Sequence, residues 1–156
     1  MRRIQHFING QHKEGTSGRS SDVYDPATGK VQAQVDLASV AEVHEAVAAA
    51  KTAAVQWAES SLTQRTQIMF RFRELLAART DELARVISGE HGKVVSDAAG
   101  EVARGLENVE FACGIAHHLK GEINEQVSEG IEVYSLRQPL GVVAGITPFN
   151  FPAMVP

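Results

Sequence analysis

The sequence has little of several features that mark specialised proteins. Its single cysteine, Cys113, excludes a disulfide within the chain and fits a reducing compartment, so a cytoplasmic location is the default expectation. It has no dense run of Lys and Arg, and its formal net charge is −4, so nucleic acid is not an expected partner. No apolar run approaches the ~18 residues of a membrane span, and Met1 to His6 lack the apolar core of a signal peptide. No membrane partner is therefore expected.

What is present has the composition of a globular domain. The 156 residues are 44% apolar and 22% charged. The first 36 positions hold turn residues and short alternating runs. An Asn-Gly pair at 9–10 predicts a hairpin, the polar stretch 15–21 predicts a loop, and strands are expected at 23–24 and 31–35 around a turn at 25–29.

Four helices are expected next. Ser39 and Glu42 have the spacing of a capping box. Apolar residues at helical spacing then predict helices over 40–57, 63–78, from 80 to a glycine at 89 or 92, and 96–118. Cys113 lies on the apolar stripe of the last helix, where a free cysteine behaves as a small hydrophobe, so it is not expected to be a nucleophile. His117 and His118 have no ligand cluster around them, so a metal site is not expected.

The periodicity changes to two after position 120. Strands are expected at 123–127 and 131–136, joined by residues 128–130. Residues 140–156 contain no charge, and Val142 to Ile146 look like a strand buried on both faces of a parallel sheet. Such a strand needs neighbours reached by crossovers, and none follows. We therefore expect a chain that continues into a larger α/β sheet and that, on its own, exposes apolar surface.

Three blocks carry a family resemblance. Residues 139–152, ending in Thr-Pro-Phe-Asn-Phe-Pro, resemble the first strand and turn of the aldehyde dehydrogenase cofactor domain. Glu90-His91-Gly92-Lys93 resembles the Glu-x-Gly-Lys segment of that superfamily, and residues 100–114 are similar to the methylmalonate-semialdehyde type. The resemblance implies an α/β fold: the N-terminal part of the aldehyde dehydrogenase fold, with β-hairpins, four helices and the first strand of a Rossmann-like parallel sheet. It divides the chain into part of an NAD-binding domain (1–120), an oligomerisation β-hairpin (121–138) and that strand with its turn (139–156).

The same resemblance implies an activity. The parent enzyme would oxidise malonate or methylmalonate semialdehyde with NAD, and CoA would release the acyl group, with loss of carbon dioxide, as acetyl-CoA or propionyl-CoA. Its expected partners are this small semialdehyde and further copies of itself, as a dimer or tetramer. The catalytic cysteine of the family would lie beyond Pro156, so the chain alone is expected to be inactive.

Site residues follow from the resemblance position by position. Asn150 would donate its side-chain amide to the oxyanion formed when a thiolate attacks the aldehyde; the alternative is that it only tightens a turn. Ile146, Thr147, Pro148 and Phe149 would face NAD at the carboxyl end of the strand. On local pattern alone, Ile146 and Phe149 would be core residues.

Arg104 is the expected substrate-binding residue. It shares a second stripe of the fourth helix with Asn108, Phe111 and Ile115, and a guanidinium there suits the carboxylate of a malonate semialdehyde. The alternative is a solvated Arg104 paired with Glu101 or Glu107 at helical spacing. Glu90 and Lys93 are given no chemistry.

Three other functions stay open at this stage. The chain can belong to another aldehyde dehydrogenase, such as a succinate-semialdehyde or betaine-aldehyde enzyme. It can be a non-catalytic module that pairs through the 121–138 hairpin. It can also be a fragment without a stable fold of its own.

Overall fold

A small mixed sheet forms the N-terminal end of the structure, a computed structural model that describes residues 1–156. β1 (Arg2–Ile4) pairs in parallel with β5 (Val31–Asp36), and β4 (Ser20–Tyr24) pairs antiparallel on the other edge of β5. β2 (His6–Ile8) and β3 (Gln11–Lys13) form a separate hairpin. Its turn residues Asn9 and Gly10 have φ values of 52° and 75°, as a type I′ turn requires, so the predicted hairpin is confirmed.

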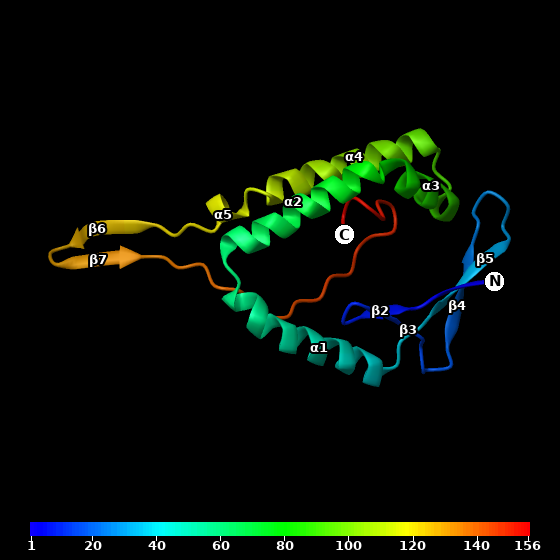
Figure 1. The fold of residues 1–156 in the computed structure, drawn as a ribbon, viewed down its shortest axis with the longest axis horizontal. Helices are drawn as coiled ribbons and strands as arrows, with labels where there is room; N and C mark the ends of the chain where they lie inside the picture. Colours follow the sequence, from blue (N-terminus) through cyan, green and yellow to red (C-terminus); the bar gives the residue numbers. More distant parts are fainter.

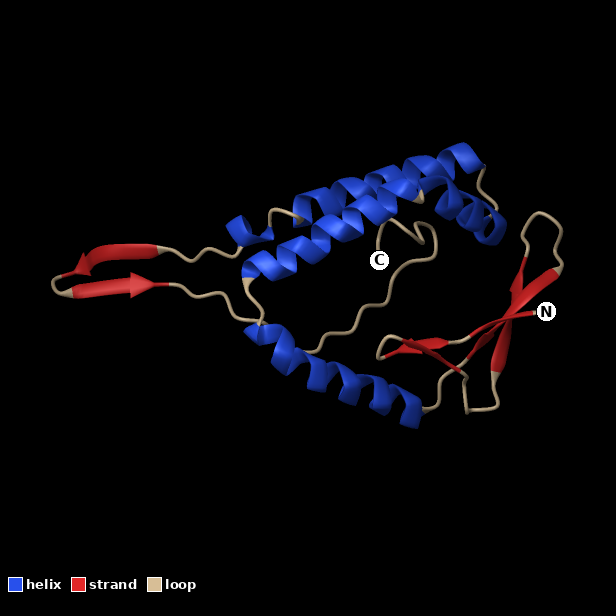
Figure 2. Ribbon diagram, viewed as in Figure 1, coloured by secondary structure: helices blue, strands red, loops and turns tan.

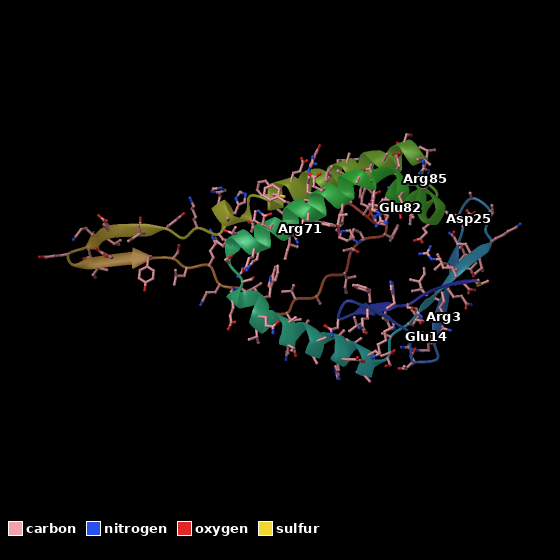
Figure 3. All side chains as sticks on the ribbon, viewed as in Figure 1. Arg3, Glu14, Asp25, Arg71, Glu82 and Arg85 are labelled. Carbon is pink, nitrogen blue, oxygen red and sulfur yellow. The ribbon has the colours of Figure 1, made fainter.

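Two buried carboxylates hold this end together. Asp36 accepts hydrogen bonds from Nε of Arg3 (2.6 Å) and from the backbone N–H of Gly15 (2.7 Å). Glu42 accepts from the backbone N–H groups of Thr16 (2.6 Å) and Ser39 (2.7 Å). Arg3 lies where the strands meet (Figure 3). These contacts fix the start of the first helix against the sheet.

The first three helices begin and end close to the predicted positions. α1 (Val40–Glu59) begins at the capping box of Ser39, and α2 (Leu62–Ala78) begins at a second capping box, formed by Ser61 with Gln64. α3 (Thr80–His91) ends at Gly92, which has φ 88°. None of the helices has the length and apolar character that crossing a bilayer requires.

The fourth predicted helix is interrupted. α4 covers Val95–Ala112, and a separate short helix, α5, covers Ile115–His118. At the break, the N–H of Cys113 is shared between the carbonyls of Val109 and Glu110, and the N–H of Gly114 bonds Phe111 three residues back. This tightening towards 3₁₀ geometry ends α4, and glycine favours a break because it is a poor helix former.

A small core joins three of the helices. α2, α3 and α4 lie together, with α1 apart from them (Figures 1 and 2). The buried residues of this core come from α3 and α4: Ala84, Ile87, Ala98 and Val102. Ala153, near the C-terminus, packs against the same cluster. The end of the chain is therefore seated on the helices.

The predicted hairpin after the helices is present and projects from the body of the protein (Figure 1). β6 (Ile123–Ser128) and β7 (Ile131–Tyr134) are antiparallel, and all their residues are exposed. Gly121 lies at the base, where a Cβ atom would come 1.9 Å from the carbonyl oxygen of Ser135. Only glycine fits this close approach of the two strands' bases.

The predicted strand Val142–Ile146 is not formed in this chain. Residues 139–150 cross from the hairpin towards the helices without strand pairing (Figure 2). Ile146 is fully exposed rather than buried on both faces. The physical reason is the one that the sequence itself suggests: a parallel strand needs hydrogen-bonded neighbours, and none is available here. The fold class is nevertheless confirmed as α/β.

Candidate functional site

The turn at the end of the chain is held by a single carboxylate. Both oxygens of Glu101, whose side chain is fully buried on α4, are used. Oε1 accepts hydrogen bonds from the backbone N–H groups of Ala153 (2.8 Å) and Met154 (3.3 Å). Oε2 accepts from Nζ of Lys93 (2.5 Å). One side chain of α4 thus binds the backbone of a turn that lies some 50 residues further along the chain.

Lys93 reaches the same turn from the other side. Its Nζ also donates to the backbone oxygen of Asn150 (3.2 Å) and lies 5.1 Å from the centre of the Phe151 ring. Burial raises the pKa of Glu101, but the hydrogen bonds from Lys93 and from the amides of Ala153 and Met154 outweigh it, so that pKa lies below its usual value. Glu101 is therefore an anion, and it carries the opposite charge to Lys93.

Asn150 stands on this fixed turn with its side chain exposed. Its backbone oxygen is bound by Lys93, whereas its side-chain amide makes no hydrogen bond within the chain. The alternative interpretation, in which the Asn150 side chain tightens the turn, finds no such bond in the structure. A primary amide has two N–H donors, so this group is available to an external oxygen.

The four residues expected to contact NAD precede Asn150 on the unpaired segment. Ile146, Thr147, Pro148 and Phe149 are all exposed, so the alternative that Ile146 and Phe149 are core residues is wrong for this chain. The segment combines apolar side chains with backbone groups that make no hydrogen bonds to the chain. The contact of these four residues with NAD stays a prediction.

Arg104 lies on the exposed side of α4, one residue position before the buried Gly105. Its Nε donates to the carbonyl of Gly100 (3.3 Å), and its Cζ lies 6.0 Å from the centre of the Phe151 ring. No ion pair joins it to Glu101 or Glu107, and Glu101 faces inward, where it is bound to Lys93. Phe151 therefore has Lys93 and Arg104 beside its ring, and it immediately follows Asn150.

Hollows flank the turn on both sides. One, of about 340 Å³, lies between α2, α4 and the end of the chain, and Asn108 of the second stripe borders it. Another, of about 590 Å³, lies between α3 and the segment before the turn, and is bordered by Phe149 and Pro152. Arg104 lines neither of them. Cys113 is half-buried at the end of α4, with no metal-binding cluster of His, Cys, Asp or Glu in the structure.

Reasoning from the sequence missed Lys93 and Glu101. A usable signal exists: Ala98, Glu101 and Gly105 are spaced by three and four, so they share one face of α4. A carboxylate on a face of small buried residues needs a partner, since burying an unpaired charge is costly. That partner is the lysine of the Glu-x-Gly-Lys segment.

The fold is α/β, and its C-terminal turn carries the exposed Asn150 amide on a backbone that Lys93 and Glu101 hold in place. The aldehyde dehydrogenase family matches residues 12–156. The chain is 46% identical over 156 residues to a malonate-semialdehyde dehydrogenase from Pseudomonas aeruginosa, covering 100% of this chain and 31% of that protein. It is 42% identical over 153 residues to the acylating mitochondrial methylmalonate-semialdehyde/malonate-semialdehyde dehydrogenase of Rattus norvegicus, covering 98% and 29%.

Solved structures give the same answer. A methylmalonate-semialdehyde dehydrogenase from Oceanimonas doudoroffii superimposes with a TM-score of 0.94 and 50% identity, over 99% of this chain and 32% of that one. A Sinorhizobium meliloti 1021 protein, solved as a complex with NAD, superimposes with a TM-score of 0.94 and 48% identity, over 99% and 32%. The chain belongs to the aldehyde dehydrogenase family. It spans about a third of the length of the curated relatives it matches.

Proposed function

We propose that this chain contributes to an NAD-dependent oxidation of malonate or methylmalonate semialdehyde, in which CoA takes the acyl group, carbon dioxide is lost, and acetyl-CoA or propionyl-CoA is released. The observation that carries the proposal is the exposed Asn150 amide on a turn whose backbone is fixed by Lys93 and Glu101. The names and the 46–50% identity of the relatives support the substrate class. A Burkholderia pseudomallei succinate-semialdehyde dehydrogenase is less similar, at 30% identity.

The chain's own residues have defined parts in this proposal. A thiolate from outside these 156 residues attacks the aldehyde carbon, and the carbonyl oxygen becomes an oxyanion. The side-chain N–H of Asn150 donates to that oxyanion, and Arg104 binds the substrate carboxylate. NAD, when bound, supplies the acceptor for the hydride. Ile146, Thr147, Pro148 and Phe149 would form part of its site, with the backbone supplying hydrogen bonds and the apolar side chains excluding water.

A direct test joins this chain at Pro156 to the part of the Pseudomonas aeruginosa relative that lies beyond its match. This protein, called here the joined enzyme, should form NADH from malonate semialdehyde in a CoA-dependent reaction. Asn150→Ala should lower the rate of single-turnover hydride transfer by ~10²–10³-fold, the usual effect of losing one oxyanion donor, with little change in NAD affinity. Asn108→Ala, the matched amide on α4, should be near normal. Near-normal hydride transfer in Asn150→Ala would remove that residue from the mechanism.

The chain alone should have no dehydrogenase activity. Its only thiol, Cys113, is half-buried at the end of α4 and makes none of the hydrogen bonds that hold the turn. NADH formation by the isolated chain that disappears in Cys113→Ala would overturn this expectation.

The projecting hairpin supports assembly as the second part of the proposal. β6 and β7 each have a free edge, and exposed apolar side chains (Ile123, Val127, Val133 and Tyr134) lie along them. We infer that this hairpin joins copies of the enzyme into a dimer or tetramer in the cytoplasm. Removing residues 123–134 from the joined enzyme should lower the number of subunits in the assembly, measured as the particle mass by light scattering. An unchanged number of subunits would contradict the hairpin's role.

A further inference from the structure

The Glu-x-Gly-Lys segment has a defined geometry that the proposed chemistry does not use directly. Gly92 ends α3 in the left-handed conformation, and Lys93 follows immediately. The Lys93 side chain is only 14% exposed, and Glu101 is not exposed at all. This is a nearly buried ion pair, and in every other Lys or Arg ion pair of the chain at least one partner is more than a third exposed. Such pairs need every lone pair and proton satisfied, because desolvation is expensive.

The remaining bonds of the pair all go to the turn that carries Asn150. Lys93 binds the backbone oxygen of Asn150, and Glu101 binds the backbone N–H groups of Ala153 and Met154. The turn is thus held at its beginning by a cation and at its end by an anion. Moving the turn would leave both charges with unsatisfied hydrogen-bonding capacity.

A glycine on α4 lets the turn lie close to the helix. Gly105 is buried one helical turn after Glu101, and a Cβ atom there would lie 3.3 Å from Cα of Met154. Gly100, on the same helix, has nothing within 4 Å of its equivalent position. The close approach at Gly105 allows the amides of Ala153 and Met154 to reach Glu101.

We propose that Lys93 and Glu101, with Gly105 beneath the turn, are positioning residues that fix the Asn150 amide where the oxyanion forms. The inference rests on the proposed function, because it concerns the same site. Neither charged group is given contact with the substrate. A misplacement of about 1 Å in a catalytic donor can lower a rate by ~10²-fold, so a fixed turn has a direct kinetic consequence.

The first experiment measures the turn itself in the 156-residue chain, independently of any activity. Hydrogen–deuterium exchange followed by mass spectrometry should show slowed exchange at Ala153 and Met154. Glu101→Ala should raise that exchange at least ~10-fold, and Gly105→Ala should raise it also. Gly100→Ala, and Arg73→Met, which removes an ion pair to Glu110 of α4, should leave it unchanged. Equal exchange at the turn in wild type and Glu101→Ala would overturn the proposal.

The second experiment is a double-mutant cycle in the joined enzyme. Glu101→Gln should lower single-turnover hydride transfer ~10–100-fold with little change in KM for the aldehyde. In an Asn150→Ala background the same change should have almost no further effect, because Glu101 acts through Asn150. Full additivity would overturn the positioning role. An unaffected Asn150→Ala enzyme would instead count against the proposed function, and the exchange experiment would still decide whether the pair fixes the turn.

A pH profile separates positioning from general loss of stability. In Lys93→Met the buried carboxylate loses its cation, so its pKa should rise. Hydride transfer should then acquire an acid limb at higher pH than in the wild type, and Lys93→Arg, which keeps the cation, should move it back. An unshifted acid limb in Lys93→Met would contradict the coupling of Lys93 to Glu101.

Discussion

The exposed surface of this chain gives a quantitative prediction. Its accessible area is 11785 Å², whereas a compact monomer of 16.8 kDa exposes about 7,600 Å². The excess of roughly 4,000 Å² is about five times the ~800 Å² that one partner buries in a standard interface. Only nine of the 156 residues are buried. The isolated chain should therefore self-associate and bind a hydrophobic dye.

The perturbation that tests this is a charge on the uncharged tail. Leu140 and Ile146 are 93% and 101% exposed, so replacing both by Lys removes no contact and should leave the melting temperature within ~1–2 °C, the small effect typical of surface substitutions. The same pair should reduce association, because single-sign charge opposes apolar contact. Dye fluorescence and light scattering should both fall below those of the wild-type chain.

The control adds charge without removing apolar surface. Gln138→Lys introduces a lysine into the same exposed segment and should change dye binding little. The reasoning is refuted if the wild-type chain is monomeric and dye-free while melting cooperatively. It is also refuted if Gln138→Lys improves solubility as much as the Leu140→Lys and Ile146→Lys pair does, since net charge alone would then explain the effect.

Three further predictions address single residues. In the joined enzyme, Arg104→Leu should lower kcat/KM for malonate semialdehyde at least ~10²-fold and leave propanal almost unaffected; equal losses would mean that Arg104 only shapes the helix. Hydrogen bonds from Ser39 and Thr16 lower the pKa of Glu42 from 4.5 to about 2, so its stabilisation should be complete above pH 4.5 and lost as the pH falls towards 2; Glu42→Gln should lack this part of the acid melting profile. Gly92→Ala should lower the free energy of unfolding by about 1 kcal/mol or more, because Gly92 has a left-handed φ and a Cβ atom there would lie 2.9 Å from Pro26. Gly89→Ala, at a helical position with nothing within 4 Å, should raise it by ~0.5–1 kcal/mol. Thermal melting measures both.

The ends of α1 and α3 could be predicted from the sequence because the signals that set them act over only a few residues. The capping box at Ser39 and the left-handed Gly92 act within one turn of helix, so sequence alone places the start of α1 and the end of α3. The apolar faces were also predicted, but their burial was not. Leu75 remains 61% exposed on α2, because a periodic pattern identifies a face without identifying what covers it.

Features that depend on distant partners were missed. β1 is three residues long and exists only through its parallel pairing with β5, some 30 residues away. The strand predicted at 142–146 does not form, although its composition suits a buried strand, because no neighbouring strand pairs with it in this chain. In both cases the backbone partner decides the structure, and local composition does not specify it.

The sequence allows two roles for Arg104: binding a substrate carboxylate, or pairing with a glutamate of its own helix. The direction in which Glu101 faces bears on the second. Helical spacing makes Glu101 a neighbour of Arg104, and spacing alone favours an ion pair between them. Glu101 also shares the inward face with Ala98 and Gly105, and there it meets Lys93 and the amides of the turn. The Glu101 carboxylate is fully buried on that inward face, whereas Arg104 lies on the exposed side of α4, so Arg104 stays outside the pair. The contact that fixes the Asn150 turn is therefore the same contact that keeps Glu101 from Arg104, which lies beside Phe151, where the proposed function places the substrate carboxylate.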